Sequence, residues 1–137
     1  MMHVNPRLAA AVLLGAASIH GAWAHHSFAI YDQGRQITLK GTVKAMQWAN
    51  PHVVIWMVVE APKGAPPVTW SVETTSPGVL TRAGWTRNSI KPGDRVSVDM
   101  RPLRDGSHGG GLETITLLDT GQVLKANFAA QEKPDTK

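Results

Sequence analysis

The feature that most constrains the fold is an alternation of apolar and polar residues, which recurs along the chain. Between residues 37 and 45, Ile37, Leu39 and Val43 alternate with threonines and lysines. Successive side chains of a strand point to opposite faces of a sheet, so this period predicts a strand with one buried side. Gly41 within it predicts a bulge or a sharp bend. Further strands are predicted at residues 68–73, 95–101, 112–118 and 122–125.

Residues 52–60 (HVVIWMVVE) are apolar at almost every position and rich in β-branched side chains. The run is too short for a typical helix, so it predicts the central and most buried strand. A turn at Asn50-Pro51 precedes it, because proline cannot donate to a strand ladder, and a hairpin loop at 62–67 follows. In the predicted strand at 95–101, the core-facing residues are expected to be Val96, Val98 and Met100.

One short helix is predicted between the third and fourth strands. Ser76 can cap its free N–H groups, and Pro77 stands where a missing N–H costs nothing. Gly84 can end the helix in a left-handed conformation. A helix of about two turns depends on packing more than on propensity. Its inward stripe is expected to contain Val79, Leu80 and Ala83.

Three strands, a short helix and two more strands are the element order of a small five-stranded Greek-key barrel of the OB type. A small β-sandwich is the alternative all-β architecture. We expect the barrel domain to cover residues 25–128, beginning with an N-terminal arm at 25–35. The loop at 104–111 (RDGSHGGG) is expected to be the most flexible, and residues 129–137 are expected to be a disordered tail.

The N-terminal residues have the pattern of a secretory signal peptide. Arg7 precedes an apolar run of about ten residues, far short of the roughly twenty that span a bilayer. Ala22 and Ala24 form the A-x-A pattern of a cleavage site, so residues 1–24 are predicted to be removed. The mature chain would then begin at His25 and be a periplasmic monomer without a membrane anchor.

The composition argues against several classes of function. The formal net charge is +4, but the basic residues are scattered and do not form the patch that nucleic-acid binding usually needs. The sequence contains no cysteine, which excludes disulfides, zinc knuckles and thiol chemistry. It shows neither a nucleophile–base motif nor a glycine-rich phosphate loop before a helix. The expected function is therefore that of a binding protein without catalytic residues.

His25 and His26 are the strongest candidate ligands. After cleavage, the α-amine and ring of His25 could chelate one ion, and His26 would add an imidazole. Copper(II) favours such tetragonal nitrogen ligation, with zinc as the second choice. The arrangement resembles the histidine brace of some exported copper proteins. Adjacent residues cannot easily supply both rings of a brace, so the barrel must provide a further ligand, with His52 preferred over His108.

Each of these histidines also has a structural explanation. A pair at a chain end can be a surface dipeptide that binds metal adventitiously, and cleavage elsewhere would leave no amine at His25. His52 can be a histidine at a strand start that hydrogen-bonds a turn carbonyl, with Asn50 ordering the turn. His108 can be a solvated loop residue.

The tryptophans support an alternative function. Trp48 precedes the predicted turn at Asn50-Pro51, and Trp85 follows the end of the predicted helix. With His108 they could form an exposed surface that binds a protein or a glycan. Both rings could equally belong to the core. A copper-dependent oxidase is a further alternative, which would need an open coordination position and a substrate-binding face.

Six short motifs occur in order along the chain: HHSF-x-x-YD, GTV, NPH, SP-x-x-L-x-R-x-GW, KPGD and P-x-RDGS. They extend from His25 to Ser107. Together they resemble a family of small exported bacterial proteins of unknown function whose mature chains begin His-His-Ser-Phe. The resemblance implies an exported, OB-like domain and no particular activity. The layout is also similar to bacterial periplasmic OB-fold proteins that do not bind nucleic acid, a similarity of architecture alone.

Overall fold

The computed structural model describes residues 28–126 and residue 128. The predicted signal peptide, the pair His25 and His26, and the predicted tail at 129–137 lie outside these residues. The described elements, in chain order, are the 3₁₀ turn η1 (Phe28–Ile30), β1 (Ile37–Gln47), β2 (Val54–Val59), β3 (Val68–Glu73), α1 (Pro77–Arg82), β4 (Arg95–Pro102), β5 (Gly109–Leu117) and β6 (Val123–Lys125).

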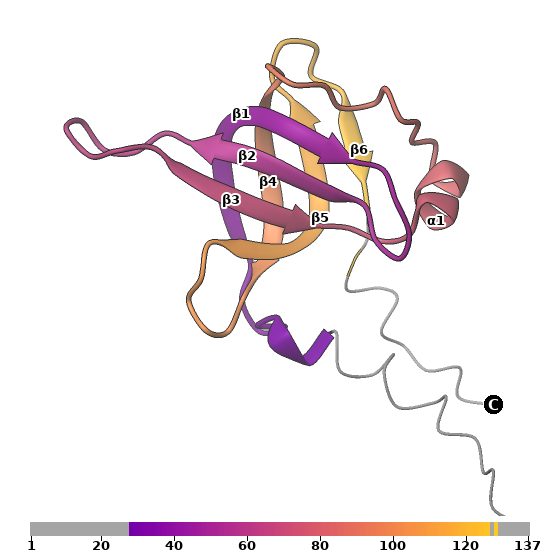
Figure 1. Ribbon diagram of the computed structural model, residues 1–137, viewed down its shortest axis with the longest axis horizontal. Coiled ribbons are helices and arrows are strands. Elements are labelled where there is room, and N and C mark those ends of the chain that lie inside the picture. Colours follow the sequence, from indigo (N-terminus) through magenta and orange to yellow (C-terminus); the bar gives the residue numbers. More distant parts are fainter. Residues whose placement is uncertain (1–27, 127, 129–137) are drawn as a thin grey trace, which may run out of the picture.

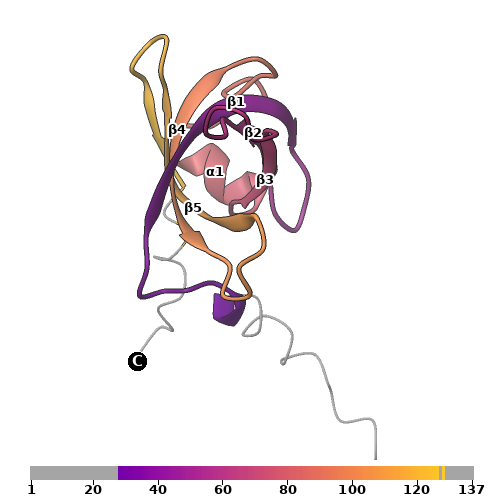
Figure 2. The same cartoon turned by 90° about the vertical axis from the view of Figure 1, so that its left-hand side faces the viewer.

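The strands form a closed barrel. Their order is β3-β2-β1-β4-β5-β6, and a parallel pairing of β3 with β5 closes the first five strands while β6 remains outside. In the end view of Figure 2, α1 is seen through the ring of strands at its far end. The predicted all-β, OB-like barrel with one short helix between its third and fourth strands is confirmed.

Strand β1 is long enough to pair with two neighbours in succession. Residues 37–42 pair with β4, and residues 41–47 pair with β2. Gly41 lies where the two pairings overlap, and a Cβ atom there would be 2.3 Å from the carbonyl oxygen of Val58. The glycine is therefore required by close backbone approach, and the bulge itself lies further along, between Val43 and Ala45.

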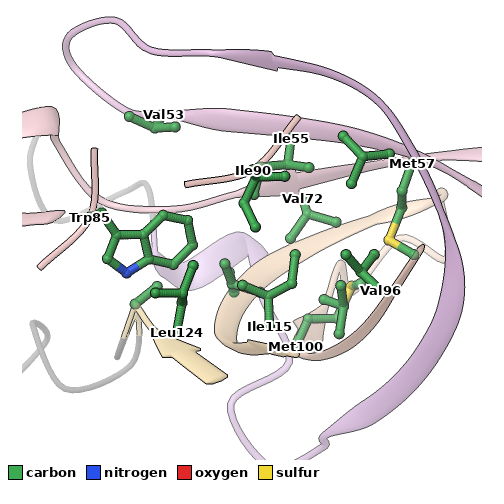
Figure 3. Close-up of a cluster of buried hydrophobic side chains, with 14 of the residues drawn as sticks. Val53, Ile55, Met57, Val72, Trp85, Ile90, Val96, Met100, Ile115 and Leu124 are labelled. Atoms are coloured by element: carbon green, nitrogen blue, oxygen red, sulfur yellow. The ribbon is translucent and has the colours of Figure 1, made fainter. Parts of the chain in front are cut away.

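Alternate residues of each barrel strand enter a single apolar core. Val96, Val98 and Met100 of β4 are buried, as predicted. In β2 only Ile55 and Met57 are buried, because the intervening residues face the outside of the barrel and are partly covered. The sequence predicts this strand as the central and most buried one, but in the closed barrel it is buried on its inner face only. Figure 3 shows the core, with Trp85 and Leu124 near one end of the cluster.

Helix α1 forms at the predicted residues. The Ser76 side chain accepts a hydrogen bond from the backbone N–H of Val79, and Gly84 has a φ of +90°. Of the expected inward stripe only Leu80 is buried, while Val79 is partly covered and Ala83 is exposed. A helix of this length, placed across the end of a barrel, reaches the core with one side chain.

Strand β5 begins earlier than predicted. Gly109, Gly110 and Gly111 were assigned to a flexible loop, but they belong to the strand and make the parallel pairing with residues 71–73 of β3. A Cβ atom at Gly111 would lie 2.3 Å from Cδ1 of Phe128. These glycines serve close packing, which sequence alone cannot distinguish from loop flexibility.

The substitution Gly111→Ala tests this role. The added methyl group would overlap the ring of Phe128, so we expect the free energy of unfolding to fall by about 1–3 kcal/mol or more. Gly78→Ala is the matched control, because the nearest atoms to its Cβ are 3.8 Å away and alanine favours a helix. Urea denaturation of both variants measures the difference. Equal stabilities of the two variants would contradict the assignment.

Candidate functional site

Three side chains from distant parts of the sequence form a hydrogen-bonded cluster on the barrel. The Tyr31 hydroxyl donates to Oε2 of Glu73 at 2.5 Å, and Oε1 of Glu73 contacts Nδ1 of His52. Glu73 is the last residue of β3, His52 lies just before β2, and Tyr31 follows η1. We call these residues the His52–Glu73–Tyr31 cluster.

Backbone hydrogen bonds beyond the β2–β3 ladder hold His52 beside Glu73. The N–H of Val53 donates to the carbonyl of Thr75 at 3.0 Å, and the N–H of Thr74 donates back to the carbonyl of Val53 at 2.8 Å. The Thr74 hydroxyl also donates to the Val53 carbonyl, at 3.0 Å. The segment before β2 is thereby fixed against the end of β3.

Two arginines of the β4–β5 region hold the arm that carries Tyr31. Arg104 donates its backbone N–H to the carbonyl of Ile30 at 2.9 Å and its Nε to the carbonyl of Tyr31 at 3.0 Å. Arg101 donates Nη1 to the carbonyl of Gln33 at 2.9 Å. Figure 1 shows η1 beside the loop that joins β4 to β5. The described part of the arm is thus docked on the barrel.

Aromatic packing fixes the same part of the arm. The ring centroid of Phe128 lies 5.0 Å from that of Phe28 and 4.9 Å from that of Tyr31, in an edge-on arrangement with the latter. Phe128 in turn packs over Gly111. The arm, the start of β5 and Phe128, three residues after β6, therefore meet at one place.

The two ends of the cluster differ in burial: the Tyr31 hydroxyl is buried, and the His52 imidazole is partly exposed. Burial raises the pKa of Tyr31 well above its ordinary value, and both the hydrogen bond to Glu73 and the negative charge of that carboxylate act in the same direction. Tyr31 therefore stays protonated and donates. The side chains of His52 and Glu73 are each 30% exposed, so the imidazole can be reached from solvent.

The structure describes one residue of the predicted metal-binding set, His52. His25 and His26 lie outside the described residues, and His52 bonds to the Glu73 carboxylate, whereas the structural explanation had expected a turn carbonyl. Among residues 28–126 and 128, no group of three or more His, Cys, Asp or Glu side chains could hold a metal ion. Within this range His52 has one further potential ligand residue beside it, Glu73.

The structure does not assemble the predicted aromatic surface. Trp85 is 1% exposed and donates its indole N–H to the carbonyl of Lys125, so its ring belongs to the core. Trp48 is partly covered and packs against that core. His108 is exposed, and its ring centroid lies 5.1 Å from that of Trp70, which is partly buried and packs against the core.

Sequence reasoning did not find Glu73 or Tyr31 as members of a site. His52 and Glu73 are 21 positions apart in the chain, and Tyr31 and Glu73 are 42 positions apart, so no local motif predicts these contacts. Tyr31 lies within the HHSF-x-x-YD motif, which was the one available signal.

No helix in the described part of the chain has the length and apolarity needed to cross a membrane.

Tyr31 provides a direct spectroscopic test of the cluster, because it is the single tyrosine of the sequence. Absorbance at 295 nm should show no tyrosinate in the folded protein at a pH of about 10 to 11, where an ordinary tyrosine ionises. The unfolded chain releases the Tyr31 proton at a lower pH than the folded protein does. The free energy of unfolding should therefore fall as the pH rises above about 10. The chain in urea is the control, with ionisation near pH 10. Reversible ionisation near pH 10 in the folded protein would contradict the buried hydrogen bond.

Comparison with known proteins places the chain in a family. Residues 12–113 match the sequence model of a family of unknown function, DUF6152. No curated protein and no solved structure matches the chain. The family match includes Tyr31, His52 and Glu73, so the whole cluster lies within the matched region. The chain therefore belongs to this family of unknown function.

Proposed function

We propose that the mature protein begins at His25, is exported to the periplasm, and binds copper(II), or zinc, at the end of the barrel that carries His52. The amine and ring of His25 and the ring of His26 would supply ligands from the arm. His52 would supply the ligand from the barrel. The proposal joins a predicted cleavage site to a docking geometry observed in the described residues.

The observation that supports the proposal most strongly is the shared carboxylate of Glu73. Tyr31 of the arm and His52 of the barrel bind its two oxygens, so the arm approaches the barrel at the candidate barrel-side ligand. His25 precedes Tyr31 by only about six residues, and a chain extends at most about 3.3–3.6 Å per residue. His25 is therefore tethered within about 20 Å of Tyr31, a range that includes His52.

The donor chemistry favours copper(II). The α-amine and the imidazoles bind a metal ion in their deprotonated forms, so binding releases protons and weakens as the pH falls. Nitrogen ligands in a tetragonal plane suit copper(II), which heads the affinity order of the divalent metals. The Nδ1 atom of His52 is engaged by Glu73, which leaves Nε2 as the atom that can reach an ion.

The alternative function, a protein- or glycan-binding surface built on Trp48 and Trp85, has less support. Stacking needs an accessible ring face, and Trp85 is buried in the core. His108 retains an exposed ring, but its aromatic neighbour is Trp70, whose side chain packs against the same core. We therefore advance the metal-binding function alone.

Titration of the chain that starts at His25 with copper(II) tests the proposal. We expect one equivalent to bind, with electron paramagnetic resonance showing nitrogen ligands. Acetylation of the N-terminus, His25→Ala and His52→Ala should each lower the affinity at least about tenfold, because each removes a ligand. His108→Ala is the matched control, since His108 is exposed and pairs with Trp70, and should leave the affinity unchanged. A site that survives both acetylation and His25→Ala would overturn the proposal.

The position of the cleavage site can be tested separately. Intact-mass measurement of the protein recovered from the periplasm should give a chain that begins at His25. Substitution of Ala24 by a bulky residue should block this cleavage, because signal peptidase requires small residues in the A-x-A pattern. A mature chain with any other first residue would eliminate the amine–imidazole chelate.

A further inference from the structure

We propose that the outer face of β2 binds an uncharged oligosaccharide, with Trp56 as the residue on which a sugar ring stacks. This face is distinct from the surface that would have combined Trp48, Trp85 and His108. It is also independent of the proposed metal site, because none of the ligands of that site takes part in it.

The outer face of β2 carries an apolar row, formed by Val54, Trp56 and Val58. These three residues alternate with the buried Ile55 and Met57 and are partly covered, but they are not among the residues that pack against the core. Figure 1 shows β1, β2 and β3 side by side, and neither α1 nor another described strand lies in front of β2. We call these three residues the outer row of β2.

The neighbouring strands do not share this feature. An antiparallel strand with one face outside the core ordinarily alternates apolar and polar residues. The first half of β1 and the whole of β3 follow this rule, with the outward residues Thr38, Lys40, Thr42, Thr69, Ser71 and Glu73. Apolar side chains gathered outside the core indicate a binding surface, so the outer row of β2 is a candidate for one.

Small side chains flank the indole of Trp56. In the strand register Trp56 lies between Ala45 of β1 and Ser71 of β3, and directly paired residues share one face of a sheet. Both side chains are too short to extend across the indole ring. Neither the indole N–H of Trp56 nor the hydroxyl of Ser71 forms a hydrogen bond with another described residue. An aromatic face and two polar groups are therefore available to a ligand.

Polar groups also border the other two residues of the outer row. Gln47 and Glu73 are paired with Val54, and Thr42 and Thr69 are paired with Val58. A sugar ring presents C–H groups on its face and hydroxyls at its edge, so a ring bordered by hydroxyl and amide groups is complementary to both. From Val54 to Val58 the outer row extends about 13 Å, at about 3.3 Å per residue, which is long enough for more than one pyranose ring.

The charges around the outer row favour a ligand without negative charge. Glu73 lies beside one end of the row, and Glu60 follows the strand at the other end. Lys44, next to Ala45 at the bulge of β1, is an exposed cation close to the row. Nucleic acids and acidic polysaccharides are bound by clusters of cations, and two carboxylates with one lysine do not provide such a cluster.

A second copy of the chain and an added peptide strand fit this face less well. Three partly covered side chains expose far less than the roughly 800 Å² that each partner buries in a stable complex. A peptide that adds a strand needs the free edge of a sheet, whereas β2 is paired with β1 and β3 along its whole length. Side chains alone must recognise the ligand, as the aromatic and hydroxyl groups of this face can do for a sugar.

Titration of the protein with cellotetraose and with chitotetraose, followed by NMR, tests the proposal. We expect saturable binding of at least one of them, with a shift of the indole N–H signal of Trp56. Trp56→Ala should weaken binding at least about tenfold, because it removes the ring on which the sugar stacks, and Trp56→Phe should retain part of the affinity. Val123→Ala is the matched control, since it shortens an exposed apolar side chain on β6, outside the barrel, and should leave the affinity unchanged.

Two results would overturn the proposal directly. One is the absence of saturable binding of both oligosaccharides, and the other is an affinity that folded Trp56→Ala leaves unchanged. Circular dichroism checks that each variant is folded. If Trp56→Ala does not fold, Ala45→Leu carries the test, because a larger side chain beside the indole should block stacking; an affinity equal to that of Val123→Ala would then overturn the proposal.

Other occupants of the face have their own signatures. Tighter binding of an oligothymidylate than of either oligosaccharide would overturn the proposal in favour of a nucleic acid. A dimer in sedimentation experiments that Trp56→Ala dissociates would show that a second copy covers the outer row, and would also overturn it. Copper(II) titration of Trp56→Ala should match that of the unsubstituted chain, so failure of this proposal is distinguishable from failure of the metal site.

Discussion

The parallel pairing of β3 with β5 is the constraint on which the rest of the structure depends. It closes the barrel through Gly109, Gly110 and Gly111, and a Cβ atom at Gly110 or Gly111 would overlap the Arg101 carbonyl oxygen or the Phe128 ring. The pairing sets Glu73 opposite Gly111 in the register. The bare face of Gly111 admits the ring of Phe128, and Tyr31 packs on that ring. Closure of the barrel and placement of the cluster are thus consequences of the same contact.

The His52–Glu73–Tyr31 cluster links the interior of the protein to its surface. A buried hydroxyl, a carboxylate and a partly exposed imidazole are joined in that order from the interior to the surface. The three residues come from separate segments of the chain, so the arrangement depends on the tertiary fold. The backbone carbonyls that Arg101 and Arg104 engage belong to the arm, and this assigns both arginines a docking role.

Much of the fold could be predicted because it depends on local pattern. The alternation in β1 and β4 and the Ser76-Pro77 start of α1 are each readable within a few residues. The start of β5 could not be predicted, because glycine occurs both in flexible loops and where backbones touch, and only the position of Phe128 decides between them. For β2 the pattern overstated burial, since the closed barrel has only one inner face.

The candidate site was less predictable than the fold. His52 could be identified from its place before a strand, but its partner Glu73 lies 21 residues further along the chain, and Glu73 is 42 residues away from Tyr31. Such contacts follow from strand register and from the docking of the arm, which a single sequence does not specify. Trp85 was a candidate surface residue that the structure places in the core. A tryptophan after a helix end has the same local sequence whether it is buried or exposed, so the sequence could not decide.

The most direct test of the account is a crystal structure of the chain that begins at His25, grown with copper(II). The account predicts one ion bound by the amine and ring of His25, the ring of His26 and Nε2 of His52, with metal–nitrogen distances near 2 Å. It also predicts that Glu73 stays hydrogen-bonded to both His52 and Tyr31. An ion bound away from His52, or an N-terminus directed away from this end of the barrel, would contradict the account.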